Sequence, residues 1–226
     1  MESIYKEYLE HLNEFERKNA PNQIYFSGDI SLLLEGKRIS VVGSRKASSE
    51  GLARASAIAK ELVRQGVIVV SGLAEGIDTV AHQSAIRNGG KTIAVLGTPI
   101  NVAFPKSNAE LLEVIKRSHL AISQFAEGYP VTAKNFPIRN RTMSLISDAT
   151  IIIEATENSG TRHQGWESLR LGRKVYILEN IIAKNNVKWV SEMIDYGAEV
   201  ITRDNYRDLI ELTPNLTSMY FNEDVF

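Results

Sequence analysis

The 226-residue chain contains no cysteine, which excludes disulfides, thiolate metal sites and a cysteine nucleophile. Its four histidines show none of the paired spacings that metal ligands use. No apolar stretch approaches the ~20 residues that span a membrane. The first residues also lack the basic and apolar regions of a secretion signal. We therefore expect a cytoplasmic protein that holds no metal and does not contact a membrane.

The motifs of common nucleotide enzymes are missing as well. Neither segment 43–46 nor segment 72–76 fits the dinucleotide fingerprint G-x-G-x-x-G, and the strand that ends at Ser71 carries no acidic residue for a ribose hydroxyl. The sequence has no Walker motif, and Ser71 and Ser159 lie outside any G-x-S-x-G nucleophile elbow. We predict no cofactor and no catalytic residue, and hence a protein that is not an enzyme.

The stretch 67–82 shows the pattern that repeats along the chain. Four β-branched residues, 67–70, predict a strand buried on both faces, the Ser71-Gly72 turn ends it, and a helix follows at once. Strands and helices alternate in this way up to residue 212, which predicts an α/β fold with a doubly wound, mostly parallel sheet and helices on both faces. The predicted strands cover 38–42, 67–71, 92–96, 120–124, 150–153, 175–178 and 199–201, and the predicted helices cover 50–65, 76–87, 108–117, 137–147, 163–171, 187–196 and 204–212.

The chain divides into one domain and two short flanking parts. The domain spans residues 23–212, with an edge strand at 23–26 before the alternation begins. Apolar residues at helical spacing over 3–18 predict one amphipathic helix in an N-terminal arm, residues 1–22. Residues 213–226 form a C-terminal tail.

Ligands of doubly wound sheets bind at the loops that follow the carboxyl ends of the strands. Basic residues from distant parts of the chain gather at these loops: Arg45 and Lys46 after the first predicted strand, and Lys134, Arg139 and Arg141 after the fourth. The net charge is only −1, from 26 basic and 27 acidic residues, so this local cluster rather than the composition predicts an anionic ligand. The alternative is that these are ordinary exposed charges.

Five motifs resemble the DNA-processing protein A (DprA/Smf) family in their order and spacing. They are residues 41–45, 71–78 with Ala81-His82, 92–97, 136–141, and 154–155 with 159–161. The resemblance covers about residues 23–178. It implies an extended Rossmann-like domain that binds single-stranded DNA in a basic pocket, forms a homodimer and delivers the strand to a RecA-like recombinase during DNA uptake and natural transformation.

The resemblance places Ser44, Arg45, Lys134, Phe136, Arg139 and Arg141 at positions that face the strand, and the residues themselves suggest the rest of the site. Asp78 and His82, one helical turn apart, are expected to hold the turn by hydrogen bonds rather than to do chemistry. Phe136, beside three basic residues, is expected to stack on a base. The predicted DNA-binding residues are Gly43, Ser44, Arg45, Lys46, Ser71, Gly72, Lys134, Phe136, Arg139, Asn140, Arg141, Ser159, Gly160 and Thr161, and the predicted supporting residues are Gly76, Asp78, His82 and Glu154.

The chain departs from the family pattern after Leu178, and we expect no C-terminal winged-helix domain. Apolar residues within 187–196 favour a homodimer surface. A second function class stays open, because the same fold family includes nucleotide sensors and phosphoribohydrolases. Gln164 stands where those hydrolases carry an acid, and a neutral amide cannot act as a carboxylate catalyst, so hydrolysis is disfavoured while a nucleotide sensor is not.

Overall fold

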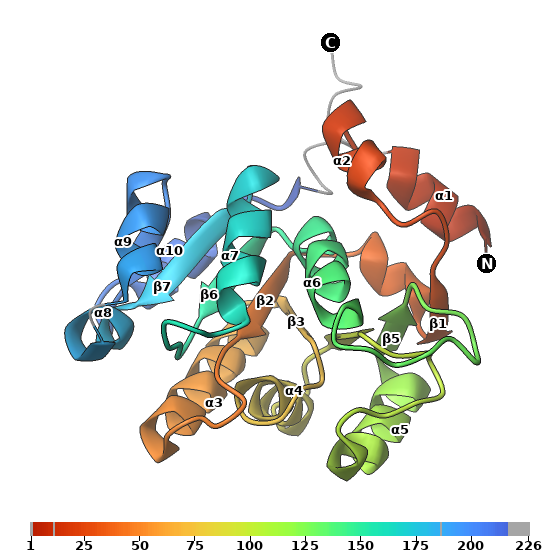
Figure 1. Cartoon of the computed structure of the whole chain (residues 1–226), viewed down its shortest axis with the longest axis horizontal. Helices are drawn as coiled ribbons and strands as arrows, with labels where there is room; N and C mark the ends of the chain where they lie inside the picture. The colour runs from red at the N-terminus through yellow and green to blue at the C-terminus, as the bar shows by residue number, and fades with distance from the viewer. Residues whose placement is uncertain (1, 11, 186, 217–226) are drawn as a thin grey trace.

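The computed structural model describes residues 2–10, 12–185 and 187–216 of the chain (Figure 1). Its centre is one eight-stranded sheet with the order β1-β5-β4-β3-β2-β6-β7-β8, in which β1 is antiparallel to β5 and the other neighbours are parallel. The strands are β1 (Tyr25–Gly28), β2 (Arg38–Val42), β3 (Ile68–Ser71), β4 (Thr92–Leu96), β5 (Leu120–Ser123), β6 (Ala149–Ile152), β7 (Lys174–Leu178) and β8 (Glu199–Ile201). The predicted α/β fold with a mostly parallel sheet is confirmed.

The central strands are buried along their whole length. Every residue of β2, β3, β4 and β6 is buried. A parallel strand covered by helices needs apolar, mostly β-branched side chains on both faces, and Ile39, Val41 and Val69 are 0% exposed. The β-branched run 67–70 therefore correctly predicted a strand that is buried on both faces.

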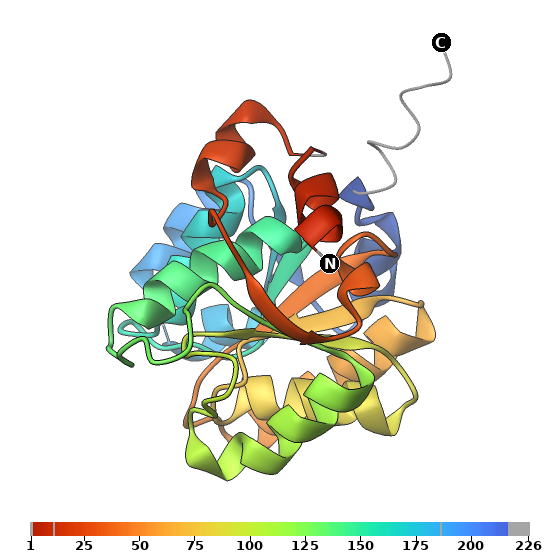
Figure 2. The same ribbon diagram turned by 90° about the vertical axis from the view of Figure 1, so that its right-hand side faces the viewer.

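Helices cover both faces of the sheet (Figure 2). They are α1 (Glu2–Glu10), α2 (Glu14–Asn19), α3 (Ser49–Arg64), α4 (Ile77–Arg87), α5 (Ala109–Ser118), α6 (Asn135–Ile146), α7 (Thr161–Arg170), α8 (Glu179–Asn185), α9 (Lys188–Asp195) and α10 (Tyr206–Leu212), with short 3-10 helices η1 (Ile30–Leu33) and η2 (Lys106–Asn108). Apolar side chains of α3, α4, α5 and α10 pack on one face, and those of α1, α6, α7, α8 and α9 pack on the other. The core is thus two apolar layers, one on each side of the sheet.

The strand order reverses between β2 and β6. From β2 the chain adds β3, β4 and β5 on one side, and it then places β6 against the other side of β2 and continues to β7 and β8. In the register of this pair Val42 lies opposite Ile152, so the two strands end level with each other. The loops that follow them run to opposite faces and leave a crevice, which is where this fold class places ligands.

The N-terminal arm contains two helices instead of the single helix predicted over 3–18. Asn13 begins α2 with a capping box: its side chain accepts a hydrogen bond from the Glu16 N–H, and the Glu16 carboxylate accepts one from the Asn13 N–H, each at 2.9 Å. Glu16 also forms a buried ion pair with Arg173 at 2.6 Å. The cap explains the break in the helix, and the ion pair fixes the arm to the segment before β7.

The segment after β7 differs most from the prediction. α8 forms where no element was predicted. The apolar residues within 187–196 pack largely inside the chain, because Trp189 and Met193 belong to the core, whereas Tyr196 is exposed. Most of these apolar residues therefore cannot form the predicted dimer surface, Tyr196 remains exposed, and the homodimer stays a prediction.

The predicted tail, 213–226, is partly described. Thr213 is buried, and its hydroxyl lies 2.9 Å from the Tyr176 hydroxyl. The N–H of Leu216 donates to Asp148 at 2.9 Å, and residues 217–226 lie outside the described residues. Within the described ranges, no helix is both long enough and apolar enough to span a bilayer.

Candidate functional site

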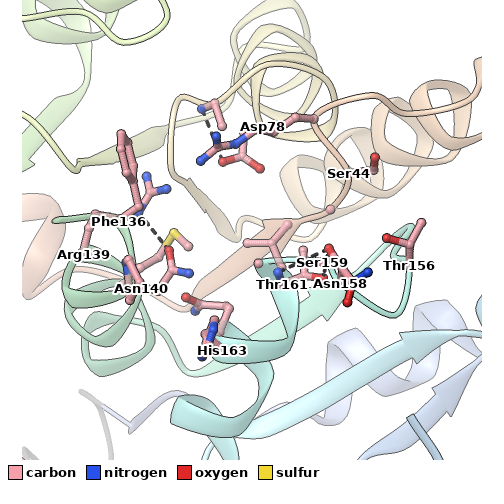
Figure 3. A pocket seen from close by; sticks show the side chains of 18 of the residues that line it. Ser44, Asp78, Phe136, Arg139, Asn140, Thr156, Asn158, Ser159, Thr161 and His163 are labelled. Atoms are coloured by element: carbon pink, nitrogen blue, oxygen red, sulfur yellow. Dashed lines mark hydrogen bonds between the residues drawn. The ribbon is translucent and has the colours of Figure 1, made fainter. Parts of the chain in front are cut away.

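A cavity of about 630 Å³ lies at the reversal of strand order, bounded by the loops after β2 and β6, the turn after β3, and the first turns of α6 and α7. Phe136, Arg139 and Asn140 on α6 face Ser159 and Thr161 across it (Figure 3). The predicted site residues that line the cavity are Gly43, Ser44, Arg45, Lys46, Asp78, Phe136, Arg139, Asn140, Ser159, Gly160 and Thr161. The fold therefore brings together four chain segments that are distant in the sequence.

The loop after β2 is held by Glu154 and Gly76. The Ser44 N–H donates to the backbone carbonyl of Glu154 at 2.9 Å, and the Glu154 carboxylate accepts hydrogen bonds from the N–H and hydroxyl of Ser48. Gly76 has a φ of +75°, and a Cβ there would lie 2.4 Å from the carbonyl oxygen of Ser44. These contacts fix the backbone that carries Ser44 and Arg45.

The turn after β3 is held by two buried side chains of opposite charge, Asp78 and Arg139. The Asp78 carboxylate accepts hydrogen bonds from the N–H groups of Gly72, at 3.1 Å, and Ala74, at 3.4 Å. The Arg139 guanidinium donates to the carbonyl oxygens of Gly72 and Val95. A Cβ at Gly72 would lie 2.0 Å from Arg139 Nη1, so the guanidinium can approach this closely only because residue 72 is glycine.

The position of Arg139 differs from the sequence prediction, which placed its charge at an exposed rim where it would face a phosphate. The residue is 5% exposed, and its Nη1 and Nε groups donate to other residues of the fold. Burial lowers the pKa of Arg139 while Asp78 opposes this change, and burial raises the pKa of Asp78 while Arg139 and two backbone N–H groups oppose it. Each charge thus stabilises the other in a poorly solvated region. Arg139 forms part of the cavity wall rather than a free phosphate ligand.

Ser71, Gly72 and His82 lie behind the cavity and do not line it. The Ser71 hydroxyl donates to the Val41 carbonyl at 2.7 Å, and Ser71 and Gly72 are both buried, so neither faces the cavity in which the strand was expected. His82 Nδ1 lies 2.7 Å from the Thr92 hydroxyl, which ties α4 to β4. Burial, with smaller contributions from His119 and Arg139, lowers the pKa of His82 to about 3, so the imidazole is neutral at pH 7.

Lys134 and Arg141 also lie outside the cavity lining. Arg141 Nε is 3.4 Å from a carboxylate oxygen of Glu167, so its charge is paired across α6 and α7. Lys134 is exposed just before α6. Lys134 and Arg141 therefore do not share the cavity lining with Arg45, and their contact with a DNA strand stays a prediction.

Arg45 and Phe136 form the most distinctive pair of the site. Both line the cavity, and the Arg45 guanidinium carbon lies 5.3 Å from the centre of the Phe136 ring. Phe136 fits against Gly97, where a Cβ would lie 2.7 Å from the ring. With Lys46 beside them, these residues offer two exposed positive charges and an aromatic face. Such a surface can bind a phosphate and a flat apolar ring together.

The start of α7 forms the opposite wall. Gly160 occupies the N-cap position, and the hydroxyls of Ser159 and Thr161 lie 2.7 Å apart. The positive end of a helix dipole favours an anion at this place. Asn158 and His163 also line the cavity, and the set of predicted site residues missed them. Both belong to the segment that follows β6, so their position after a buried strand was the available signal.

The charge around the cavity is mainly positive. Arg45, Lys46 and Arg139 line it, whereas Asp78 is the acidic residue among the lining residues. Among the residues that the structure describes, no three histidine, aspartate or glutamate side chains are grouped so that they could hold a metal ion. The cavity is therefore suited to an organic anion that has both charge and a planar ring.

The family comparison agrees with this geometry. The profile of the DNA recombination-mediator protein A family matches residues 2–213. The chain belongs to this family. The DNA processing protein DprA of Streptococcus pneumoniae is 34% identical over 184 residues, which are 81% of this chain and 64% of that protein. Protein Smf of a Synechocystis strain is 35% identical over 167 residues, 74% of this chain and 42% of that protein. The chain thus spans less than two thirds of the length of these two relatives.

Solved structures of the DprA family share the fold. The X-ray structure of DprA from Streptococcus pneumoniae superposes with a TM-score of 0.79 at 31% sequence identity. The match covers 92% of this chain and 70% of the Streptococcus pneumoniae chain. A structure of DprA from Helicobacter pylori, described for its single-stranded DNA binding mode, has a TM-score of 0.76 at 22% identity and covers 90% of both chains. The predicted Rossmann-like architecture and family are thereby confirmed.

Proposed function

We propose that this chain binds single-stranded DNA in the cavity between β2 and β6 and that it serves in DNA processing and recombination. The observation that carries the proposal is the Arg45–Phe136 pair, in which a guanidinium lies 5.3 Å from an aromatic ring at the edge of the cavity. A positive charge beside a ring binds a phosphate and an unpaired base of one nucleotide, and it does so with little dependence on sequence. The single-stranded DNA binding mode described for the Helicobacter pylori protein supports it.

Two partners belong to the same proposal. The family description, a recombination mediator, supports delivery of the bound strand to a RecA-like recombinase. We further propose a homodimer, for which the exposed Tyr196 and Ile182 offer surface on the α8–α9 side. Natural transformation is the pathway in which such a protein would meet an incoming single strand.

In the proposed function the protein binds its ligand and does not catalyse a reaction. Gln164 lines the cavity where a phosphoribohydrolase would need an acid, and its amide nitrogen lies 3.4 Å from the Thr150 hydroxyl. The second candidate function is a nucleotide sensor. It is favoured by the volume of about 630 Å³, which falls within the usual range for small-ligand pockets, roughly 300 to 1,000 Å³.

A length series of oligonucleotides separates the two functions. Binding of dT1, dT3, dT6, dT9 and dT12 is measured by fluorescence anisotropy or calorimetry at one salt concentration, with a 12-base-pair duplex as comparison. A strand binder gains affinity with length and binds the duplex more weakly, because paired bases have no free face for Phe136. Equal affinity for dT1 and dT12 contradicts strand binding and favours the sensor.

A further inference from the structure

A second aromatic ring lies exposed next to Phe136. Phe104, in the loop between β4 and η2, is 47% exposed, and its ring centre lies 5.3 Å from that of Phe136 with an angle of 43° between the planes. Phe104 does not line the cavity. Because Phe136 does, the two rings form an aromatic platform, Phe104 and Phe136, that continues from the cavity onto the surface.

The loop that carries Phe104 is held in place by hydrogen bonds. The Thr98 hydroxyl donates to the Val102 carbonyl at 2.6 Å, and the Val102 N–H donates to the Pro99 carbonyl at 2.9 Å. On the far side of Phe104, the buried Asn108 amide donates to the Leu73 carbonyl at 2.9 Å. The chain on both sides of Phe104 is therefore anchored, and the outward position of the ring is built into the fold.

The surroundings of the platform suit nucleic acid. Arg45 contacts Phe136, and two exposed lysines adjoin the rings in the sequence: Lys106 two residues after Phe104, and Lys134 two residues before Phe136. An exposed phenylalanine beside a ring that Arg45 contacts resembles the stacking platforms that hold successive bases of a single strand. The platform is also continuous with the cavity proposed to bind the first nucleotide.

We propose that Phe104 is a second stacking site for the same strand and takes an unpaired base that adjoins the nucleotide held at Arg45 and Phe136. This inference rests on the proposed function, because it extends the path of the strand out of the cavity. The occupant is single-stranded nucleic acid of at least two or three nucleotides. A mononucleotide in the cavity does not reach Phe104, and a duplex offers it no free base face.

The test compares the length series for wild type, Phe104→Ala and Phe104→Tyr, with Val102→Ala as the matched control. Val102 is 37% exposed in the same loop, and the control removes apolar surface without removing a ring. Phe104→Ala should bind dT1 like wild type and bind dT6 to dT12 roughly 5- to 150-fold more weakly, the loss expected for one base stack. Phe104→Tyr should retain wild-type affinity, and none of the variants should change the salt dependence.

The results separate the two levels of the proposal. If wild type gains affinity with length and Phe104→Ala gains equally, the second stacking site is refuted while strand binding stands. If wild type gains nothing with length, strand binding itself fails, and the second site fails with it. Light scattering of wild type and Phe104→Ala tests whether the platform is a protein contact instead. A changed oligomeric mass in Phe104→Ala, together with unchanged binding of dT12, would refute the stacking site and assign the platform to such a contact.

Discussion

Replacing Arg139 should damage the fold more than it damages the DNA site, although sequence alone places this residue among the DNA ligands. Arg139→Met removes the donor to the Gly72 and Val95 carbonyls and leaves the Asp78 carboxylate buried without its counter-charge. Removing one partner of a buried pair costs about 3–5 kcal/mol. For a chain of this length 1 kcal/mol corresponds to about 2–4 °C, so the melting temperature should fall by roughly 6–20 °C.

The double variant Asp78→Asn with Arg139→Met tests whether the two charges act as a pair. It removes both charges, so its loss of stability should be smaller than the sum of the two single losses, with a coupling of roughly 0.5–3 kcal/mol. Arg45→Met is the exposed control and should change the free energy of unfolding by no more than about 0.5 kcal/mol. Thermal and urea unfolding followed by circular dichroism measure wild type, the two single variants Arg139→Met and Asp78→Asn, the double variant and Arg45→Met. An Arg139→Met protein that melts like wild type but no longer binds DNA would refute the buried role.

Glu154, His82 and the cavity itself can each be tested by a separate measurement. Glu154→Gln weakens the hydrogen bonds to Ser48 and loosens the loop that carries Arg45, so the variant should bind dT12 more weakly than wild type. The control Lys60→Gln, on the distant part of α3, should bind dT12 like wild type. Equal affinities of the two variants would contradict this prediction. His82 has a pKa of about 3 in the folded protein and about 6.5 in the unfolded chain, so between these pH values the unfolded chain binds one more proton. The contribution of His82 to the free energy of unfolding is therefore complete above pH 6.5 and falls by about 1.4 kcal/mol per pH unit as the pH decreases toward 3. His82→Asn should reduce this acid slope by about one proton in urea unfolding at pH 7, 5.5 and 4.5, and an unchanged slope would show that the imidazole is not the titrating group. Nucleoside monophosphates, NAD and ATP should stay intact with the protein by chromatography, and release of a free base that is abolished in Glu154→Gln would restore the enzyme class.

The sheet and the location of the site could be predicted from the sequence, because both follow from local patterns. β-branched runs such as 67–70 predict central strands, and alternation with helices predicts parallel order. The loops after Val42 and Ile152 could therefore be assigned to one crevice before their contacts were known.

The individual contacts could not be predicted, because they depend on residues far apart in the chain. Arg139 looks like a surface charge at the start of a helix, and its acceptor at Gly72 is 67 positions away. The pairing of Arg141 with Glu167 and the contact of Phe104 with Phe136 also depend on how loops and helices pack. The helix α8 follows a departure from the family pattern, so neither the resemblance nor a strong apolar period predicted it.

The salt dependence of dT12 binding tests whether the cavity between β2 and β6 binds a single strand. Each phosphate contact of a single strand contributes about 0.7 to the slope of log affinity against log salt concentration. Arg45→Gln should lower affinity for unrelated sequences alike and reduce this slope by about 0.7, whereas Phe136→Ala should weaken binding by roughly 1–3 kcal/mol and leave the slope unchanged. Lys60→Gln should leave both affinity and slope at the wild-type value. Wild-type affinity and slope in Arg45→Gln and Phe136→Ala together would contradict the assignment of this cavity to single-stranded DNA.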